Sequence, residues 1–207
     1  AEQLWKSSER KGNGQLSVVP EWASPVVTPF LSPAEVGQKF SLLKPLVCLF
    51  PGSVWATKQW TENGYVELGQ RLAEKFQVVV MGGPGEEALA TRVAEKIPSS
   101  QNLAGHCNLE ETLAILAMAE LVVTNDSAGQ HLAALAGTKT VSIFGPTILP
   151  FGFRPWNSRA IVVERVGLSC RPCGKHGPMK CPIGTHECMK SIASNEVYRA
   201  CEKLLAI

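Results

Sequence analysis

The residues best suited to chemistry lie where an apolar strand meets an apolar helix. The stretch 122–136 is apolar except for Asn125, Asp126, Ser127 and His131, which gather at this junction. A carboxylate, a hydroxyl and an imidazole can bind a ligand, but the same residue types also cap helices and lie in cores as hydrogen-bonded side chains. Taken singly, either role fits, so the neighbouring residues must decide between them.

The backbone at this junction favours an anion site. If the side chain of Asp126 or Ser127 caps the helix, the amides of Ala128 and Gly129 point into open space, where small residues let a ligand approach. Amides at a helix N-terminus bind anions because their N–H groups and the helix dipole both favour negative charge. His131 follows Ser127 by about one helical turn on the same side, where it can contact the ligand or brace the loop.

A second loop offers a cation for the same ligand. The loop after the first apolar strand contains Ser53, Thr57 and Lys58. Lys58 is a point charge on a flexible stem between hydroxyls, which suits a diphosphate. In the alternative interpretation, Trp55 and Trp60 pack locally and Lys58 is solvated.

A glycine-rich turn matches the sequence pattern of a dinucleotide-binding fingerprint, but its charged residues do not suit a dinucleotide. Gly83-Pro-Gly-Glu-Glu-Ala88 has the pattern that binds a pyrophosphate between a strand and a helix. Glu86 and Glu87 would face that pyrophosphate and repel it, which argues against a nicotinamide or flavin site. Two interpretations stay open for these glutamates: they complement the helix dipole, or one of them accepts hydrogen bonds from ribose hydroxyls.

Strands and helices that alternate along the chain must position these loops. We predict strands over 46–50, 77–81, 121–124, 140–144 and 160–163, and helices over 62–76, 86–96, 109–119, 127–136 and 195–205. This alternation is typical of a doubly wound α/β domain, with a parallel sheet covered by helices on both faces. Ligands of such sheets bind beyond the carboxyl ends of the strands, where the polar loops and the turn Gly145-Pro-Thr147 lie.

The first part of the chain differs from the rest. Residues 1–45 hold scattered prolines and a Gly-Asn-Gly turn without a strand or helix period, so we interpret them as an interdomain linker. Residues 46–207 form the predicted domain. Because the sequence starts without Met, and a linker is an odd start for a domain, we expect an N-terminal portion of the natural protein to be absent.

Composition limits the class of protein. Of 207 residues, 45% are hydrophobic, and the net charge of +2 comes from scattered residues, which argues against nucleic acid as a partner. The sequence has no apolar run near the ~20 residues of a membrane span and no apolar signal-peptide centre. Three isolated cysteines in apolar segments suit buried thiols in a reducing compartment. We therefore predict a cytoplasmic protein with at most peripheral membrane contact.

Four further cysteines cluster near the C-terminus at positions Cys170, Cys173, Cys181 and Cys188. A CxxC pair is a common start of a zinc site, but the spacing of the second pair is not that of a standard zinc knuckle. Structural zinc, free or redox-labile thiols and local disulfides are all compatible with the pattern. Each would fasten the segment 165–190 to the sheet edge.

The motifs between residues 47 and 147 form an ordered set. They are Pro51-Gly-Ser53, Ala56-Thr-Lys-Gln-Trp60, Met81-Gly-Gly83, Asn102-Leu-Ala-Gly105, Thr124-Asn-Asp-Ser127 with His131, and Phe144-Gly-Pro-Thr147. In this order they resemble the heptosyltransferase family of lipopolysaccharide core biosynthesis, in particular heptosyltransferase II-like proteins. The cysteine-rich tail is similar to that of some family members but not all.

The resemblance implies a GT-B architecture, in which two Rossmann-like domains cooperate and the C-terminal one binds the donor. This chain would be that donor half. Similar proteins transfer L-glycero-D-manno-heptose from ADP-heptose to the lipopolysaccharide inner core, with inversion and without an active-site metal. The acceptor site and the carboxylate general base of the family belong to the N-terminal domain, so we expect the chain alone to be inactive.

The resemblance also implies catalytic roles for two residues. Lys58 would hold the diphosphate, with Ser53 and Thr57 nearby, and Asp126 would face the heptose hydroxyls. As ADP departs, negative charge grows on the diphosphate while the sugar becomes oxocarbenium-like. A lysine and a helix N-terminus can stabilise the first charge, and Asp126 faces the second.

Several further positions receive binding roles by the same resemblance. Glu86 or Glu87 would bind the ribose, and Leu109 would contact the adenine. The amides after Asp126 would receive phosphate, and His131 would support that loop.

Two other functions stay open. The domain could be a stand-alone nucleotide-binding module without catalysis, or a glycosyltransferase that uses another nucleotide sugar. Residues 1–45 distinguish the first case, because integral packing favours a module and a draped linker favours half of a larger enzyme.

Overall fold

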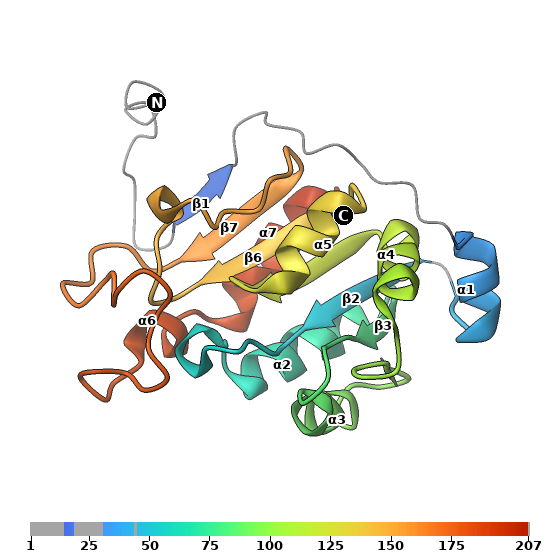
Figure 1. Ribbon diagram of the computed structural model, residues 1–207, viewed down its shortest axis with the longest axis horizontal. Coiled ribbons are helices and arrows are strands. Elements are labelled where there is room, and N and C mark those ends of the chain that lie inside the picture. The colour runs from blue at the N-terminus through green and yellow to red at the C-terminus, as the bar shows by residue number, and fades with distance from the viewer. Residues whose placement is uncertain (1–14, 19–30, 44, 207) are drawn as a thin grey trace.

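One sheet forms the centre of the computed structural model, which describes residues 15–18, 31–43 and 45–206 (Figure 1). Its described strands are β1 (Gln15–Val18), β2 (Leu46–Phe50), β3 (Gln77–Val80), β4 (Gln101–Asn102), β5 (Leu121–Asn125), β6 (Thr140–Phe144) and β7 (Ala160–Glu164). Their order across the sheet is β1-β7-β6-β5-β2-β3-β4. Neighbours from β7 to β4 are parallel, whereas β1 pairs with β7 in the antiparallel direction.

The strand order fixes where a ligand can bind. The chain runs outward from β2 to β4, returns to β5 beside β2, and then runs outward to β7. This is the order of a Rossmann fold, whose switch point here lies between β2 and β5. Phe50 pairs with Thr124, so the two strands end nearly level and their following loops open at the same edge. The predicted doubly wound parallel sheet is confirmed.

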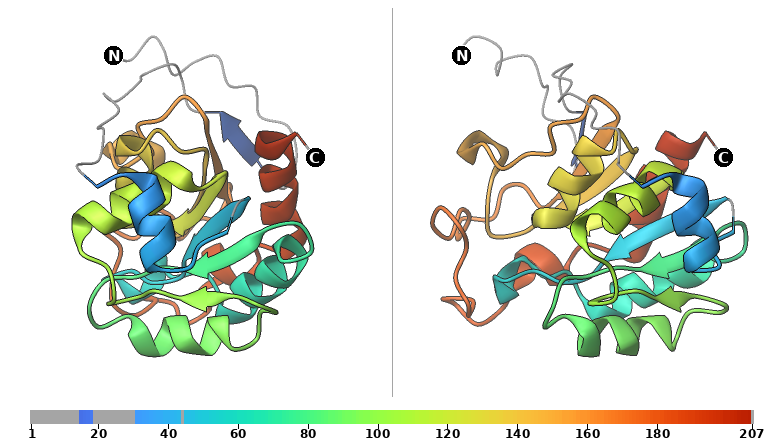
Figure 2. Two further views of the ribbon diagram at one scale, coloured as in Figure 1. Left: turned by 90° about the vertical axis from the view of Figure 1, so that its right-hand side faces the viewer. Right: turned by 45° about the vertical axis from the view of Figure 1, so that its right-hand side comes forward.

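Helices cover both faces of the sheet (Figure 2). They are α1 (Pro33–Lys39), α2 (Glu62–Leu72), α3 (Glu87–Ala94), α4 (Leu109–Met118), α5 (Ala128–Leu135), α6 (Glu187–Lys190) and α7 (Ser194–Leu205), with short 3-10 turns η2 (Ala56–Lys58) and η3 (Leu149–Phe151). Helices α2, α3 and α7 pack on one face, and α1, α4 and α5 on the other. None of the described helices is long and apolar enough to cross a lipid bilayer.

The strand β2 shows why the sheet is buried on both sides. Val47 and Leu49 belong to the core under α2 and α7, while Leu46, Cys48 and Phe50 belong to the core under α1 and α4. Successive side chains of a strand point to opposite faces, so a strand covered on both faces reads as a continuous apolar run.

The predicted elements are present, with shifted ends. The largest shift is at the helix predicted over 62–76, which begins at Glu62 behind its cap Thr61, as expected, but ends at Leu72. Beyond Leu72 the backbone tightens, because the amide of Lys75 bonds to the carbonyl of Leu72 at 3.1 Å. Periodicity continues through such a turn and therefore overstates the length of the helix.

Two segments of residues 1–45, the stretch that we interpret as an interdomain linker, form regular elements that pack on the domain. The strand β1 extends the sheet, and α1 packs on α4 through the buried Val36. Ser32 and Glu35 form a capping box at the start of α1, with the amide of Glu35 at 3.2 Å from the Ser32 hydroxyl. Residues 1–14, 19–30 and 44 of this stretch lie outside the described residues.

Candidate functional site

A cavity of about 870 Å³ opens at the carboxyl ends of β2, β3 and β5. Its walls come from the loops after these strands, from α3, from the first turns of α4 and α5, and from Phe153. Among the predicted site residues, Ser53, Lys58, Glu86, Leu109, Asp126, Ser127, Ala128, Gly129 and His131 line it. This size falls within the ~300–1,000 Å³ of typical small-molecule sites, and the location is the switch point of the sheet.

Lys58 and Asp126 form a buried ion pair across the switch point. The Lys58 Nζ lies 2.6 Å from the Asp126 Oδ2, and the two side chains are only 7% and 2% exposed. The alternative of a solvated Lys58 is therefore wrong. Buried charges require a partner because desolvation of each ion is costly. Here each residue of the pair is the partner of the other.

Two more side chains hold the Asp126 carboxylate. The Thr147 hydroxyl donates to Oδ2 at 2.6 Å, and the Gln130 amide donates to Oδ1 at 2.9 Å. Gln130 also donates to the Phe153 carbonyl at 2.6 Å, and the Phe153 ring lies 5.4 Å from the Lys58 ammonium. Both oxygens of Asp126 are thus engaged independently of Lys58.

The start of α5 is not capped by a side chain. Ser127 occupies the N-cap position but makes no side-chain capping bond, and its hydroxyl lies 3.3 Å from that of Thr124. Asp126 does not cap either, because its carboxylate is engaged elsewhere. The predicted cap is therefore wrong, while the predicted approach to the backbone of Ala128 and Gly129 agrees with their place in the cavity wall.

Asn125 ties the two central loops together. Its Oδ1 accepts from the Trp60 amide at 2.9 Å, and its Nδ2 donates to the carbonyls of Pro51 at 2.9 Å and Gly52 at 3.1 Å. The sequence places this residue at the junction but does not predict it as part of the site. Gln130 and Thr147 were also missed as site residues, although Gln130 follows Asp126 by one helical turn.

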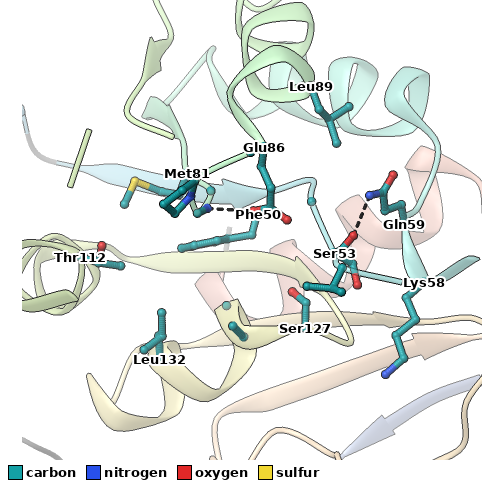
Figure 3. A pocket seen from close by; sticks show the side chains of 18 of the residues that line it. Phe50, Ser53, Lys58, Gln59, Met81, Glu86, Leu89, Thr112, Ser127 and Leu132 are labelled. Atoms are coloured by element: carbon teal, nitrogen blue, oxygen red, sulfur yellow. Dashed lines mark hydrogen bonds between the residues drawn. The ribbon is translucent and has the colours of Figure 1, made fainter. Parts of the chain in front are cut away.

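The cavity is polar and cationic at one end and more apolar at the other (Figure 3). Lys58 and Gln59 lie at the first end, and Leu132 and Thr112 at the second, with Glu86 between them. Leu109 also lines the cavity and is 61% exposed.

Of the two glutamates of the glycine-rich turn, Glu86 lines the cavity and Glu87 does not. Glu86 lines the cavity and accepts from the Gly83 amide at 2.9 Å. Its carboxylate lies so close to Gly52 that a Cβ there would be 2.1 Å from Oε1. Glu87 accepts from the Gly85 amide at 2.8 Å and is not among the lining residues. The Glu86 carboxylate thus covers the turn that a dinucleotide fingerprint would offer to a pyrophosphate.

Thr57 faces away from the cavity. Its hydroxyl donates to the Pro178 carbonyl, and its own carbonyl lies 2.8 Å from the His186 Nε2. Thr57 is not among the lining residues, so the structure does not bring it together with Lys58 as a ligand-binding side chain.

His131 lines the cavity as an uncharged side chain at neutral pH. Burial lowers its pKa, and although the nearby Asp126 acts to raise the pKa, Lys58 acts to lower it. A neutral imidazole can donate one hydrogen bond and accept another, which suits the predicted support of the loop.

The clustered cysteines are free thiols in the structure, which does not favour the disulfide alternative. Within the described part of the chain, no three His, Cys, Asp or Glu side chains are grouped as a metal ion would need. Cys181 has a lowered pKa because amide groups, foremost that of His186, point at its sulfur. Structural zinc stays a prediction.

A parallel sheet in this order, with a charged cavity at its switch point, defines a Rossmann-like α/β protein. The family model of glycosyltransferase family 9 (heptosyltransferase) matches residues 26–182. The chain therefore belongs to this family.

Individual relatives agree with this family. The chain is 27% identical over 168 residues to lipooligosaccharide heptosyltransferase 2 of Campylobacter jejuni, covering 78% of this chain and 51% of the relative. It is 31% identical over 168 residues to lipopolysaccharide heptosyltransferase 2 of Salmonella typhimurium, covering 74% and 48%. The solved structure of Escherichia coli ADP-heptose lipopolysaccharide heptosyltransferase II matches with a TM-score of 0.71 at 24% identity, over 84% of this chain and 51% of that one. The chain spans about half the length of these proteins.

Proposed function

We propose that this chain is the donor-binding domain of a heptosyltransferase that transfers heptose from ADP-heptose to the lipopolysaccharide inner core with inversion. The observation that carries the proposal is the Lys58–Asp126 ion pair, which lies at the switch point beside the uncapped start of α5. Family membership supports glycosyl transfer in general. The names of the relatives support heptose and lipopolysaccharide as the donor sugar and the acceptor.

The order of side chains along the cavity suits a nucleotide sugar. Leu109 and Leu132 offer an apolar surface for the base, and the Glu86 carboxylate can accept hydrogen bonds from ribose hydroxyls. Lys58 and the first amides of α5 can hold the diphosphate, because a lysine is a point charge for phosphate and a helix N-terminus binds anions. The sugar then lies next to Asp126.

The ion pair gives a mechanism for charge separation. Before the donor binds, Lys58 and Asp126 neutralise each other at 2.6 Å. When the diphosphate arrives, Lys58 turns to it, while Asp126 keeps its hydrogen bonds from Thr147 and Gln130. As the glycosidic C–O bond breaks, the leaving ADP gains negative charge near Lys58, and the sugar gains positive charge near Asp126. Fixed charges that match these changes lower the barrier.

In this proposal the acceptor and the general base are bound by another domain of the enzyme. Among the described residues, the carboxylates that line the cavity are Asp126, which is held by Lys58, Thr147 and Gln130, and Glu86, which accepts from the Gly83 amide. The chain alone therefore binds the donor and does not turn over.

A stand-alone nucleotide-binding module is the second candidate. It is favoured by one observation, the packing of β1 and α1 onto the domain, because integral packing of the first 45 residues is expected of a module. Transfer activity of a longer protein with the same donor domain distinguishes the two, since a module has none.

Calorimetric titration with ADP, UDP and their sugar conjugates tests the proposal. We expect ADP and ADP-heptose to bind, and Lys58→Ala to weaken both by about tenfold or more, as the loss of a charged hydrogen bond does. Lys180→Ala, at an exposed position away from the cavity lining, is the matched control. A preference for UDP would overturn the donor, and heptose transfer by the chain alone would overturn the donor-only role.

A further inference from the structure

The cysteine-rich segment, residues 165–190, extends beyond the carboxyl ends of the strands, where it is drawn in orange (Figure 1). It contacts two turns that bear on the Lys58–Asp126 pair, one that carries Lys58 and one whose Thr147 hydroxyl donates to Asp126. One turn is η2, which contains Thr57 and Lys58, and the other is the turn 145–147.

His186 and Pro178 fasten the η2 turn. The His186 Nε2 lies 2.8 Å from the Thr57 carbonyl, and the Thr57 hydroxyl donates to the Pro178 carbonyl. Gly177 packs directly against the turn, since a Cβ there would lie 3.2 Å from the Thr57 hydroxyl. Thr57 precedes Lys58, so these bonds fix the backbone from which the lysine side chain extends.

Arg171 fastens the other turn. Its side chain is 5% exposed, donates to the carbonyls of Gly145 and Thr147, and pairs with Glu164 at 2.6 Å. The Cys173 amide adds a bond to the Pro146 carbonyl at 2.8 Å. This turn carries the Thr147 hydroxyl that donates to Asp126. A guanidinium suits the task because its donors form a rigid fork that can bond several acceptors at once.

We propose that Arg171 and His186 are positioning residues: His186 holds the turn that carries Lys58, and Arg171 holds the turn whose Thr147 hydroxyl fixes Asp126. The inference rests on the proposed function, because it assigns the segment a role in donor binding. It also explains why a segment that contributes no residue to the cavity lining packs so closely behind it. A displacement of about 1 Å can cost about a hundredfold in rate, so fixing a turn from behind is sufficient to affect catalysis.

The test uses two substitutions of His186 in the full chain. His186 has a φ of 53°, a conformation that Asn adopts readily, so His186→Asn keeps the backbone while its shorter amide falls short of Thr57. His186→Gln has a longer amide that can restore the bond. Arg171→Lys tests the second turn, because it keeps the charge beside Glu164 but loses the fork. Lys180→Ala, at an exposed position in the same segment, is the control.

Two measurements separate positioning from folding. The first is acylation of Lys58 by acetic anhydride, mapped by mass spectrometry. We expect about tenfold faster labelling in His186→Asn and Arg171→Lys, and rates near that of the original chain in His186→Gln and Lys180→Ala, because a displaced turn uncovers the ammonium. The second is ADP affinity, which we expect to fall in the same two variants, with urea midpoints recorded for all four.

The outcomes distinguish this inference from the proposed function. Unchanged Lys58 labelling in a folded His186→Asn protein overturns the positioning role, whatever ADP does. If the original chain does not bind ADP while labelling responds as expected, the donor proposal fails and the positioning of Lys58 stands. If His186→Gln labels as fast as His186→Asn, the bond to Thr57 is not the cause and the inference is overturned.

Discussion

The ammonium of Lys58 lies 2.6 Å from the carboxylate of Asp126, although the two residues follow different strands of the sheet. The pair exists because β2 and β5 are neighbours at the switch point and end nearly level, so their loops face each other. Asn125 then bonds the β2 loop to the end of β5. The charges of the site are therefore a direct product of the strand order.

Removing one partner of this pair should destabilise the fold. We expect Lys58→Met to lower the free energy of unfolding by about 3–5 kcal/mol, because it leaves the Asp126 carboxylate buried without its cation. The double variant Lys58→Met/Asp126→Asn should lose clearly less than the sum of the two single variants, since neither charge is then left alone. Urea unfolding of the three variants measures the coupling.

A surface pair provides the control. Lys96 and Glu62 form an ion pair at 3.2 Å in which Lys96 is 58% exposed. Lys96→Met should therefore change stability by no more than about 1 kcal/mol. Equal losses in Lys58→Met and Lys96→Met would show that the pair with Asp126 is not buried in solution.

The hydroxyl of Thr147 should matter separately from the lysine. Thr147→Val keeps the shape but removes the donor to the Asp126 Oδ2, and we expect a loss of about 1.5–3 kcal/mol, as for hydrogen bonds to charged groups. Thr185→Val, at an exposed position, should stay within about 0.5 kcal/mol. Equal free energies of unfolding for the two variants would show that the hydrogen bond from Thr147 to Asp126 does not stabilise the fold.

Most of the fold could be predicted from the sequence because its strands are buried on both faces. Continuous apolar runs such as 46–50 identify them, and the helices between them follow from periodicity. The strand β1 and the helix α1 were missed for different reasons. In β1 the alternation of polar and apolar residues extends over only four positions, too few to distinguish a strand from a loop, whereas Ser32-Pro-Ala-Glu35 is a capping box with proline at the first helical position, which indicates the start of a helix.

The site was predictable in its location and only partly in its contacts. The rule that ligands bind at the carboxyl edge places Lys58 and Asp126 near each other, but residue types do not reveal that they pair directly. Thr57 illustrates the limit. Its hydroxyl is as suitable for phosphate as that of Ser53, and only the packing of the cysteine-rich segment turns it away toward Pro178. Contacts made between distant segments are invisible to local patterns.

Gly129 should tolerate no side chain. A Cβ there would lie 2.7 Å from the Thr124 hydroxyl and 2.9 Å from the Phe50 ring, so α5 would have to move away from β2. We expect Gly129→Ala to cost about 1–3 kcal/mol by overpacking and to weaken ADP binding. For stability, Gly83→Ala is the control, because a Cβ there meets nothing closer than 4.0 Å. Urea unfolding should separate these two variants, calorimetry measures ADP binding by Gly129→Ala against the original chain, and a stable, ADP-binding Gly129→Ala protein would contradict the close approach.

The cysteines should differ widely in reactivity. Hydrogen bonds from amides, first that of His186 at 3.3 Å, lower the pKa of Cys181, whereas burial raises the pKa of Cys188 to about 11. Burial also raises the pKa values of Cys48 and Cys201 well above that of an ordinary thiol. After dialysis against a chelator, iodoacetamide should therefore modify Cys181 first and the two core thiols last, because the thiolate is the nucleophile. Mass spectrometry of the peptides gives the order, and faster labelling of Cys188 than of Cys181 would refute it.

His131 should make the stability of the fold depend on pH. Its pKa is lowered by burial, so between the folded pKa and the ordinary value of ~6.5 the unfolded chain binds more protons than the folded one. Stability is therefore complete above this range and falls as the pH drops through it. In His131→Gln this contribution is absent, and the melting temperature should decline less between neutral and mildly acidic pH. The difference should stay below the ~2–4 °C that 1 kcal/mol produces in a domain of this size, because His131 is only half-buried. The measurement is the melting temperature of the original chain, of His131→Gln and of the control His106→Gln, at an exposed position, over this pH range. Equal declines of the three melting temperatures would refute the prediction.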